Sequence, residues 1–596
     1  MDIKPNFEKA AYLNNLGVIE AKNNNLTKAI SSFRKALTFY PNYEKSLYNL
    51  GSLEIRVGKY NRAIKHFRQL IHLNNQDPVS YYKLAYSFFR KGNVHQAEMN
   101  YQKALQINPD YEPALVDLGS LYMLTEFYPQ AIKQLEKALQ INPNNTYAIG
   151  FVLYISQIIV DFSRVDKWTA VLNRLTAQAL KTGEGTLETP FPSIARKSDP
   201  EENFKVAKYW SKTIKDSLAD LKTNFSFEDR KKVKRKINIG YLSYDFRNHP
   251  TSHLIFSLFR LHNRERFNIF TYSSGPDDKS VWRKYIEKNS DVFRDIKKKS
   301  DFEMAKLIYK DKVDILVDLM GYIKNSKIAI LALGPSPVQV SWLGFPGTTG
   351  ADFMDYIIAD KIVLPEKDIP FYSEKPLYLP CYQMYSTTGK TPKNKIKKSD
   401  FGLPEKSIVF TSFNQTYKIE KDLFSIWMEI LKAIPGSILW QLETNSLAKE
   451  NLKKEAKKKG INPSRIIFAA RIPREEHLER LTLADLGLDT FTYNGHTTTS
   501  DCLWAGVPVI TLKGNHFASR VSASLLSTVG LPELITQSKD DYKSLAIKLA
   551  SQPKELKKLK NKLAKNRLTS SLFNAEKFIK NLEKLYEKIW NDYLKI

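Results

Sequence analysis

A period of 34 residues runs through the first quarter of the chain. It is kept by alanines, by small residues at a second position and by bulky apolar residues at a third: Ala29, Ala63, Ala97, Ala131; Gly17, Gly51, Ala85, Gly119; Phe33, Phe67, Tyr101, Leu135. Pro41, Pro109 and Pro143 end three of the four units. Small residues let two helices approach closely, bulky ones fill the gap to the next pair, and proline stops a helix. The period therefore predicts a stack of four helical hairpins.

These units resemble the tetratricopeptide repeat, matched across about residues 8–143. Arrays of this kind present a concave surface to peptides or partner domains. We expect the repeats to occupy residues 1–145. Residues 146–235 continue the helical pattern without the period, which indicates a degenerate repeat, a cap and a linker, and 181–200 reads as a connector.

The chain has 596 residues, too many for one core, and a net charge of +28. Its lysines are spread over predicted linkers and helix faces without interleaved aromatic residues. This favours a solvated surface, with an anionic protein partner, a membrane surface and specific nucleic-acid binding as less favoured alternatives. Only two cysteines occur, Cys381 and Cys502, as expected for a reducing compartment.

The first residues lack the basic and then apolar order of a leader peptide. No apolar run reaches the ~20 residues of a membrane helix. We therefore expect a cytoplasmic protein without a membrane span. The Lys/Asn/Ile-rich composition also suggests a bacterial source.

From Ile237 the pattern changes to short apolar runs separated by helical segments, the signature of parallel α/β sheets. One series comprises "INIGYLS", "FNIFTYS", "DILVDL", "VQVSWLG" and "DYIIAD", and a second comprises "SIVFTSF", "SILWQLE", "RIIFAA", "LGLDTF" and "VPVITL". We predict two doubly wound lobes, 236–383 and 401–596, joined by a lysine-rich linker at 384–400 and closed by a terminal helix. The expected fold is an α-solenoid followed by two Rossmann-like lobes, an arrangement that resembles GT-B glycosyltransferases, with ligands at the carboxyl ends of the strands.

The motif "NGHTTTSD" lies between a predicted strand and a predicted helix. His496, Thr497 and Thr498 fall where the free N–H groups of a helix start favour an anion such as a diphosphate. Asp501, in the first turn, is placed to accept a hydrogen bond from a sugar hydroxyl or a ribose. An ordinary Thr/Ser cap with a structural histidine explains the same spacing.

Two further segments follow predicted strands of the second lobe. Gln415 and Lys418 stand after "SIVFTSF", where a lysine can neutralise the charge of a departing nucleoside diphosphate. Arg474, His477 and Arg480 are spaced to face one ligand from a helix start. The alternatives are a surface lysine and a solvated charged helix.

In the first lobe, "GYLSYDFRNHPTSH" places Asp245, His249 and His253 after the first strand. His249 precedes a proline on a rigid turn, and we expect it to titrate near neutrality as a base; a buried structural histidine is the alternative. Neither the HExxH spacing of zinc enzymes nor the GxSxG motif of serine hydrolases occurs. We therefore predict neither metal catalysis nor serine hydrolysis.

The chain resembles the O-linked N-acetylglucosamine transferase family, also called SPINDLY-like, over about residues 237–590. The matching strings are "GYLSYDFRNHPTSH", "WLGFPGTTGADFMDYIIAD", "YSEKPLYLP", "GLPEKSIVFTSFNQTYKI", "PREEHLER", "NGHTTTSDCLWAGVPVITL" and "ASRVSASLL". The resemblance implies inverting transfer of a sugar from a nucleotide sugar to Ser or Thr of proteins, which would run along the repeats.

The resemblance also implies roles for individual residues. His249 would be the base on the acceptor side, and Lys418 would stabilise the leaving diphosphate. The uridine, ribose and phosphates would be held by Gln415, Arg474, His477, Arg480, His496, Thr497, Thr498 and Asp501. No metal or other cofactor is implied.

The chain departs from the animal members of the family in four ways, of which the first is its array of about four repeats, against about a dozen in the long animal forms. It also lacks the large domain between the lobes, Arg474 stands for a lysine, and Asp314 stands for a cleft histidine. The donor expected is UDP-N-acetylglucosamine, with GDP-fucose or UDP-glucose as alternatives. A third possibility is an adaptor whose lobes bind nucleotide without turnover. A homo-oligomer is compatible with the sequence.

Overall fold

The computed structural model describes residues 3–595 except 184–185, 187, 220, 222, 224, 231–234, 388–390 and 393–395. The chain forms two compact units. The first comprises Met1–Ser156 and Arg164–Leu172, and the second comprises Gln157–Ser163 and Asn173–Ile596.

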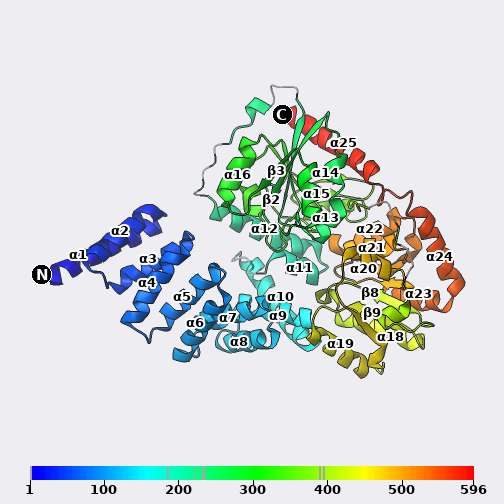
Figure 1. Ribbon diagram of the computed structural model, residues 1–596, viewed down its shortest axis with the longest axis horizontal. Helices are drawn as coiled ribbons and strands as arrows, with labels where there is room; N and C mark the ends of the chain where they lie inside the picture. The colour runs from blue at the N-terminus through cyan, green and yellow to red at the C-terminus, as the bar shows by residue number, and fades with distance from the viewer. Residues whose placement is uncertain are drawn as a thin grey trace. The chain divides into compact units, whose positions relative to one another are not determined.

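Four helical hairpins follow one another in the first unit, as the period predicts (Figure 1). Their helices are α1 (Ile3–Lys22), α2 (Leu26–Phe39), α3 (Glu44–Arg56), α4 (Tyr60–Leu73), α5 (Pro78–Arg90), α6 (Val94–Ile107), α7 (Glu112–Leu124) and α8 (Tyr128–Ile141). The alanines of the period are fully buried. Helices α9 (Thr146–Ile159) and α10 (Phe162–Thr182) continue the helical pattern without the period.

Small residues are required where the two helices of a hairpin touch. A Cβ atom added to Gly51 would lie 2.8 Å from the Phe67 ring, and one added to Gly119 would lie 2.6 Å from Cγ of Leu135. The bulky positions of the period thus occupy the space that the small positions leave, which is why the two recur in register.

The first lobe of the second unit is built on a seven-stranded, wholly parallel sheet of order β3-β2-β1-β4-β5-β6-β7. Its strands are β1 (Ile237–Ser243), β2 (Phe267–Ser273), β3 (Val292–Asp295), β4 (Ile315–Asp318), β5 (Val338–Ser341), β6 (Tyr356–Ala359) and β7 (Lys375–Tyr378). Its helices and the helices that lead into it are α11 (Pro190–Arg196), α12 (Pro200–Ser217), α13 (Pro250–Ile255), α14 (Leu258–Leu261), α15 (Val281–Asn289), α16 (Asp301–Lys310) and α17 (Ile328–Ala332).

The second lobe has a six-stranded parallel sheet of order β10-β9-β8-β11-β12-β13. Its strands are β8 (Val409–Ser412), β9 (Ile438–Leu442), β10 (Ile466–Ala469), β11 (Leu486–Leu488), β12 (Val509–Leu512) and β13 (Ile535–Thr536). Its helices are α18 (Lys421–Ala433), α19 (Ser446–Lys458), α20 (Arg474–Leu481), α21 (Thr497–Trp504), α22 (Val521–Thr528), α23 (Lys539–Ser551) and α24 (Pro553–Asn566).

All ten predicted strands are present, and the expected fold class is confirmed. The three strands that the sequence did not predict, β3, β7 and β13, all lie at sheet edges. Their sequences are short or polar, and β7 contains Pro376, which an edge strand tolerates because one side of its backbone needs no partner.

The predicted terminal helix is α25 (Ala575–Leu594), and it completes the first lobe rather than the second (Figure 1). Phe578 stacks on Trp342 with 5.8 Å between the ring centroids. The Tyr586 and Tyr241 hydroxyls are 3.2 Å apart. The chain therefore returns to the first lobe after building the second.

Two segments expected as loose linkers are more ordered than the sequence indicates. The connector at 181–200 contains α11, and the linker at 384–400 begins with three buried residues, Met384 to Ser386. Residues 388–390 and 393–395 of that linker lie outside the described residues. Within the described part of the chain, no helix is both long and apolar enough to cross a bilayer.

Substitution of Gly119 by alanine should destabilise the repeat unit. Alanine normally stabilises a helix by about 1 kcal/mol relative to glycine, but here its methyl group would overlap Leu135, and overpacking costs about 1–3 kcal/mol. Gly150→Ala in α9 is the matched control, because nothing lies within 4 Å of its added Cβ. We expect urea unfolding followed by circular dichroism to give a lower midpoint for Gly119→Ala and an unchanged or higher one for Gly150→Ala. Equal midpoints for the two variants would contradict the packing argument.

Candidate active site

The strand order of the second sheet reverses between β8 and β11, which are neighbours in space but not in sequence. The loops after two such strands leave in opposite directions and open a crevice where ligands bind in doubly wound sheets. The loop after β8 carries Gln415 and Lys418, and the loop after β11 carries residues 489–496 and leads into α21. The topology thus brings together two motifs that are almost 80 residues apart.

Lys418 is 8% exposed, and its Nζ donates a hydrogen bond of 2.8 Å to the backbone oxygen of Asn494. The same Nζ lies 4.3 Å from the centre of the Tyr493 ring. Burial lowers the pKa of Lys418 to about 7, although the nearby Asp489 carboxylate acts in the opposite direction. At neutral pH Lys418 is therefore close to the midpoint of its titration. A bound anion would favour the charged ammonium form.

Asp489 and Asn494 fix the loop that receives the lysine. Asp489 accepts hydrogen bonds of 2.7 Å from the Gly495 N–H and from the Thr511 hydroxyl. The Asn494 side chain donates to the Thr490 oxygen at 2.6 Å. No motif in the sequence identifies Asp489, Asn494 or Tyr493 individually as residues of the site. The only signal for them was the polar density of the loop after a buried strand.

The helix start predicted from "NGHTTTSD" is present, with Thr497 as the first residue of α21. His496 stacks on Tyr493 at 5.0 Å, and its Nε2 is buried without a hydrogen-bond partner among the described residues. Burial and the neighbouring Lys418 hold the pKa of His496 well below its usual range, so the ring is neutral. A buried polar atom of this kind is costly unless a ligand satisfies it.

The four hydroxyls of this motif divide into two pairs. Thr499 bonds to Ser522 at 2.8 Å, and Ser500 accepts from Gln383 at 2.7 Å, so both are structural. Thr497 and Thr498 are half-buried at the helix start, next to His496. Gln415 is also half-buried and immediately precedes the short helical turn that ends at Lys418.

Arg474 lies at the start of α20 and reaches the segment between the lobes. It donates to Asp501 at 3.1 Å, and its guanidinium lies 5.0 Å from the Tyr385 ring and 6.0 Å from the Trp282 ring of the first lobe. The Tyr385 hydroxyl donates to the same Asp501 oxygen at 2.6 Å. Asp501 is thus engaged by two protein donors, while Nη1 of Arg474 is buried without a partner among the described residues.

The expectation that three side chains of α20 face one ligand is wrong for Arg480. It is 2% exposed, donates to the Ala470 oxygen at 2.6 Å and lies over the Phe413 ring at 4.9 Å. Its Nε donates to Nδ1 of His477 at 3.0 Å, which leaves the proton of the neutral ring on Nε2. Burial lowers the pKa of His477 to about 3. Arg480 therefore orients His477 from inside the lobe.

In the first lobe, His249 caps α13 and follows β1. Its Nδ1 accepts from the Thr251 N–H at 3.3 Å and lies 3.4 Å from Asp245. Burial, with a contribution from Arg247, lowers the pKa of His249 to about 4, so the expectation that it titrates near neutrality is wrong. His249 is neutral at pH 7, which is the state of a base, but its affinity for a proton is low.

Two other first-lobe residues are structural. His253 bonds to Asn248 at 2.8 Å and packs on Trp282 at 4.7 Å. Asp314, expected in place of a cleft histidine, lies at the amino end of β4, at the opposite edge of the sheet. It is fully buried and accepts from Arg235 at 2.6 Å and from the Asn238 N–H at 2.8 Å. It therefore does not belong to the cleft.

The carboxyl edge of the second sheet thus gathers hydrogen-bond donors rather than metal ligands. Lys418, the start of α21 and the unpartnered atoms of His496 and Arg474 are all suited to an anion such as a diphosphate. Among the described residues, no group of three or more His, Cys, Asp or Glu side chains is arranged to hold a metal ion.

Replacing Lys418 by methionine should stabilise the folded protein at neutral pH. The folded state lowers the pKa of Lys418 from 10.5 to about 7, so the cost of burying its charge is complete below pH 7 and disappears as pH rises to 10.5. We expect a gain of about 1–3 kcal/mol at or below pH 7 that shrinks towards pH 10. Thermal unfolding of the variant and the wild type, measured between about pH 6 and pH 10, tests this gain in stability. The exposed Lys432→Met is the control. A destabilised variant at pH 7 would contradict the expectation.

Comparisons with known proteins bear on the family and the fold of the chain. The model of glycosyl transferase family 41 matches residues 207–388 and 382–582, and tetratricopeptide repeat models match 10–43, 48–112 and 88–151. A solved O-GlcNAc transferase mutant from Thermobaculum terrenum superposes with a TM-score of 0.63 at 22% identity and covers 99% of both chains, which supports the fold.

Two relatives carry the name UDP-N-acetylglucosamine–peptide N-acetylglucosaminyltransferase. One from Arabidopsis thaliana, named as a probable enzyme of this kind, is 41% identical over 364 residues, which are 60% of this chain and 37% of the relative. One from Caenorhabditis elegans is 29% identical over 487 residues, 62% of this chain and 42% of the relative. The chain thus spans less than half the length of these relatives. Because the family model covers most of the sequence, the chain belongs to glycosyl transferase family 41.

Proposed function

We propose that the chain transfers N-acetylglucosamine from UDP-N-acetylglucosamine to Ser or Thr hydroxyls of proteins, with inversion at the anomeric carbon. The observation that carries the proposal is the buried Lys418, held on the Asn494 oxygen beside the start of α21. The names of the two relatives support the choice of donor and acceptor.

In this mechanism the acceptor oxygen attacks the anomeric carbon while the bond from that carbon to the diphosphate breaks. The electron pair of that bond leaves with UDP, and negative charge grows on the diphosphate. Lys418 and the N–H groups at the start of α21 stabilise this charge in a site that excludes water, where such stabilisation is most effective. Thr497, Thr498 and the His496 Nε2 supply further hydrogen bonds to the phosphates.

The remaining residues divide between the nucleotide and the acceptor. Gln415, Arg474, Asp501 and His477 would hold the uridine and ribose, with Arg480 fixing the His477 ring. His249 lies in the lobe that would receive the acceptor and is neutral, as required for it to take the acceptor proton. No metal is needed in this proposal, because the lysine and the helix start neutralise the diphosphate.

Protein acceptors would bind along the repeats, since arrays of this kind present concave peptide-binding surfaces. We also propose a cytoplasmic location, in keeping with the two buried, unpaired cysteines, Cys381 and Cys502. A bacterial source and a homo-oligomer stay predictions. Specific nucleic-acid binding is not part of the proposal.

Lys418→Ala should reduce transfer by about 100- to 1,000-fold, as expected when a group that stabilises developing charge is removed. The measurement is UDP release from UDP-N-acetylglucosamine with protein extract as acceptor. Lys432→Ala, an exposed lysine on α18, is the control and should keep wild-type activity. Near-normal transfer by Lys418→Ala would rule out this mechanism.

The donor is tested by calorimetric titration with UDP and, separately, with GDP. We expect UDP to bind at least about tenfold more tightly, a difference of about 1.4 kcal/mol. Preference for GDP would indicate a fucosyltransferase. Binding of neither nucleotide would favour an adaptor that uses its repeats alone.

A further inference from the structure

The expected connector contains a helix, α11, that is held by buried polar contacts. Ser193 donates to the Asn203 side chain at 2.7 Å, and the Trp210 indole donates to the Glu188 oxygen at 2.6 Å. Glu188, itself 5% exposed, forms an ion pair with Arg196. A flexible tether would not hold buried side chains in fixed hydrogen bonds and an ion pair.

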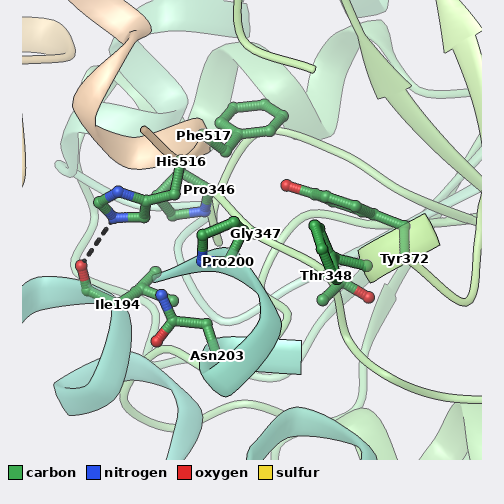
Figure 2. A pocket seen from close by; sticks show the side chains of 10 residues that line it. Ile194, Pro200, Asn203, Pro346, Gly347, Thr348, Tyr372, His516 and Phe517 are labelled. Atoms are coloured by element: carbon green, nitrogen blue, oxygen red, sulfur yellow. Dashed lines mark hydrogen bonds between the residues drawn. The ribbon is translucent and has the colours of Figure 1, made fainter. Parts of the chain in front are cut away.

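Helix α11 contacts both lobes. Ile194 is 3% exposed and belongs to one apolar cluster with Phe345 of the first lobe and with Tyr493 and Ala518 of the second. The His516 ring bonds to the Ile194 backbone oxygen at 3.0 Å (Figure 2). The cavity beside this contact measures about 20 Å³, room for about one water molecule. The helix is therefore closely packed where the lobes meet.

Phe191, in the first turn of α11, reaches the surroundings of Lys418. Its ring centre lies 6.1 Å from that of Tyr417 and 5.9 Å from that of Tyr493, and these two tyrosines are 6.3 Å apart. Each ring thus touches the other two. Tyr417 precedes Lys418 in the chain, and Tyr493 is the ring against which both Lys418 and His496 lie.

We propose that Phe191 is a positioning residue of the active site, which holds Tyr417 and Tyr493 and through them sets the place of the Lys418 ammonium and the His496 ring. The proposal rests on the proposed function in that Lys418 is taken as the group that meets the diphosphate. It assigns to the connector a part in the site that neither the family match nor the sequence motifs contain.

The physical basis is the exclusion of water from the lysine. The charged or titratable groups that face Lys418 are Asp489, His496 and the tyrosines of the aromatic cluster. Of these, only Asp489 favours the ammonium form as a carboxylate, and it is already shared among the donors of its own loop. Removing the Phe191 ring lets water reach Tyr493 and Lys418, which weakens the desolvation and loosens the tyrosines.

The test compares Phe191→Ala with Phe191→Tyr, which keeps the ring, and with Phe293→Ala, which removes a half-buried ring from the edge strand β3. Trace acetylation with acetic anhydride across pH, read by mass spectrometry at Lys418, measures its proton affinity without using activity. In Phe191→Ala we expect the pH midpoint of Lys418 acetylation to rise by about one pH unit or more. Phe191→Tyr and Phe293→Ala should match the wild type.

UDP titration at about pH 6, where Lys418 is charged in every variant, gives the second readout. Phe191→Ala should bind UDP about tenfold more weakly, and Phe191→Tyr should restore the affinity. An acetylation midpoint unchanged in Phe191→Ala would overturn the proposal, and if that variant does not fold, Phe191→Leu tests the same point. Failure of the wild type to bind UDP would refute the proposed function, whereas the acetylation arm would still decide the role of Phe191.

Discussion

A buried ammonium group sits where the strand order of the second sheet reverses, and one backbone carbonyl, that of Asn494, receives its hydrogen bond. The rest of the lobe is arranged around this contact. Asp489 ties the receiving loop to β12, Tyr493 forms one wall, and α21 begins two residues after Gly495. A charge held out of water destabilises a fold, and such destabilisation is typical of sites that bind an oppositely charged ligand.

The two lobes contribute different chemistry. The second lobe supplies cations and hydrogen-bond donors, while the histidines that face the cleft from both lobes are kept neutral by burial. Neutral imidazoles accept and donate hydrogen bonds without adding charge, so the positive charge in the site is concentrated on Lys418 and Arg474. Tyr385, from the segment between the lobes, bonds to Asp501 and so connects this segment directly to α21 of the second lobe.

Much of the architecture follows from local patterns, because helical repeats and buried parallel strands each leave a periodic signature. The 34-residue period predicts the four hairpins, but the expectation that the bulky residues fill the gap between hairpins is incomplete, because Phe67 packs on Gly51 of its own hairpin. Edge strands were missed since they are short and partly polar. Asp314 was assigned to the cleft by resemblance alone, which does not reveal the end of the strand that a residue occupies. Asp314 precedes β4 and Asp318 ends it, so the two carboxylates lie at opposite ends of the strand, about 13 Å apart.

The site residues were harder to predict because their roles depend on partners distant in the chain. Arg480 matches the spacing of a ligand-binding face, yet Phe413 and Ala470 draw it into the lobe. Phe191 lies in a segment rich in turn-forming residues, where an aromatic side chain gives no hint of its target.

The position of α25 has a consequence for folding during synthesis. Its side chains belong to the core of the first lobe, where Phe578 stacks on Trp342, Glu583 bonds to His262, and Tyr586 meets Tyr241. During synthesis the first sheet emerges from the ribosome long before this helix. Part of the apolar surface of the first lobe therefore stays uncovered until the second lobe has been synthesised. A nascent chain thus exposes the apolar surface of the first lobe that α25 later covers, for as long as the second lobe is being synthesised.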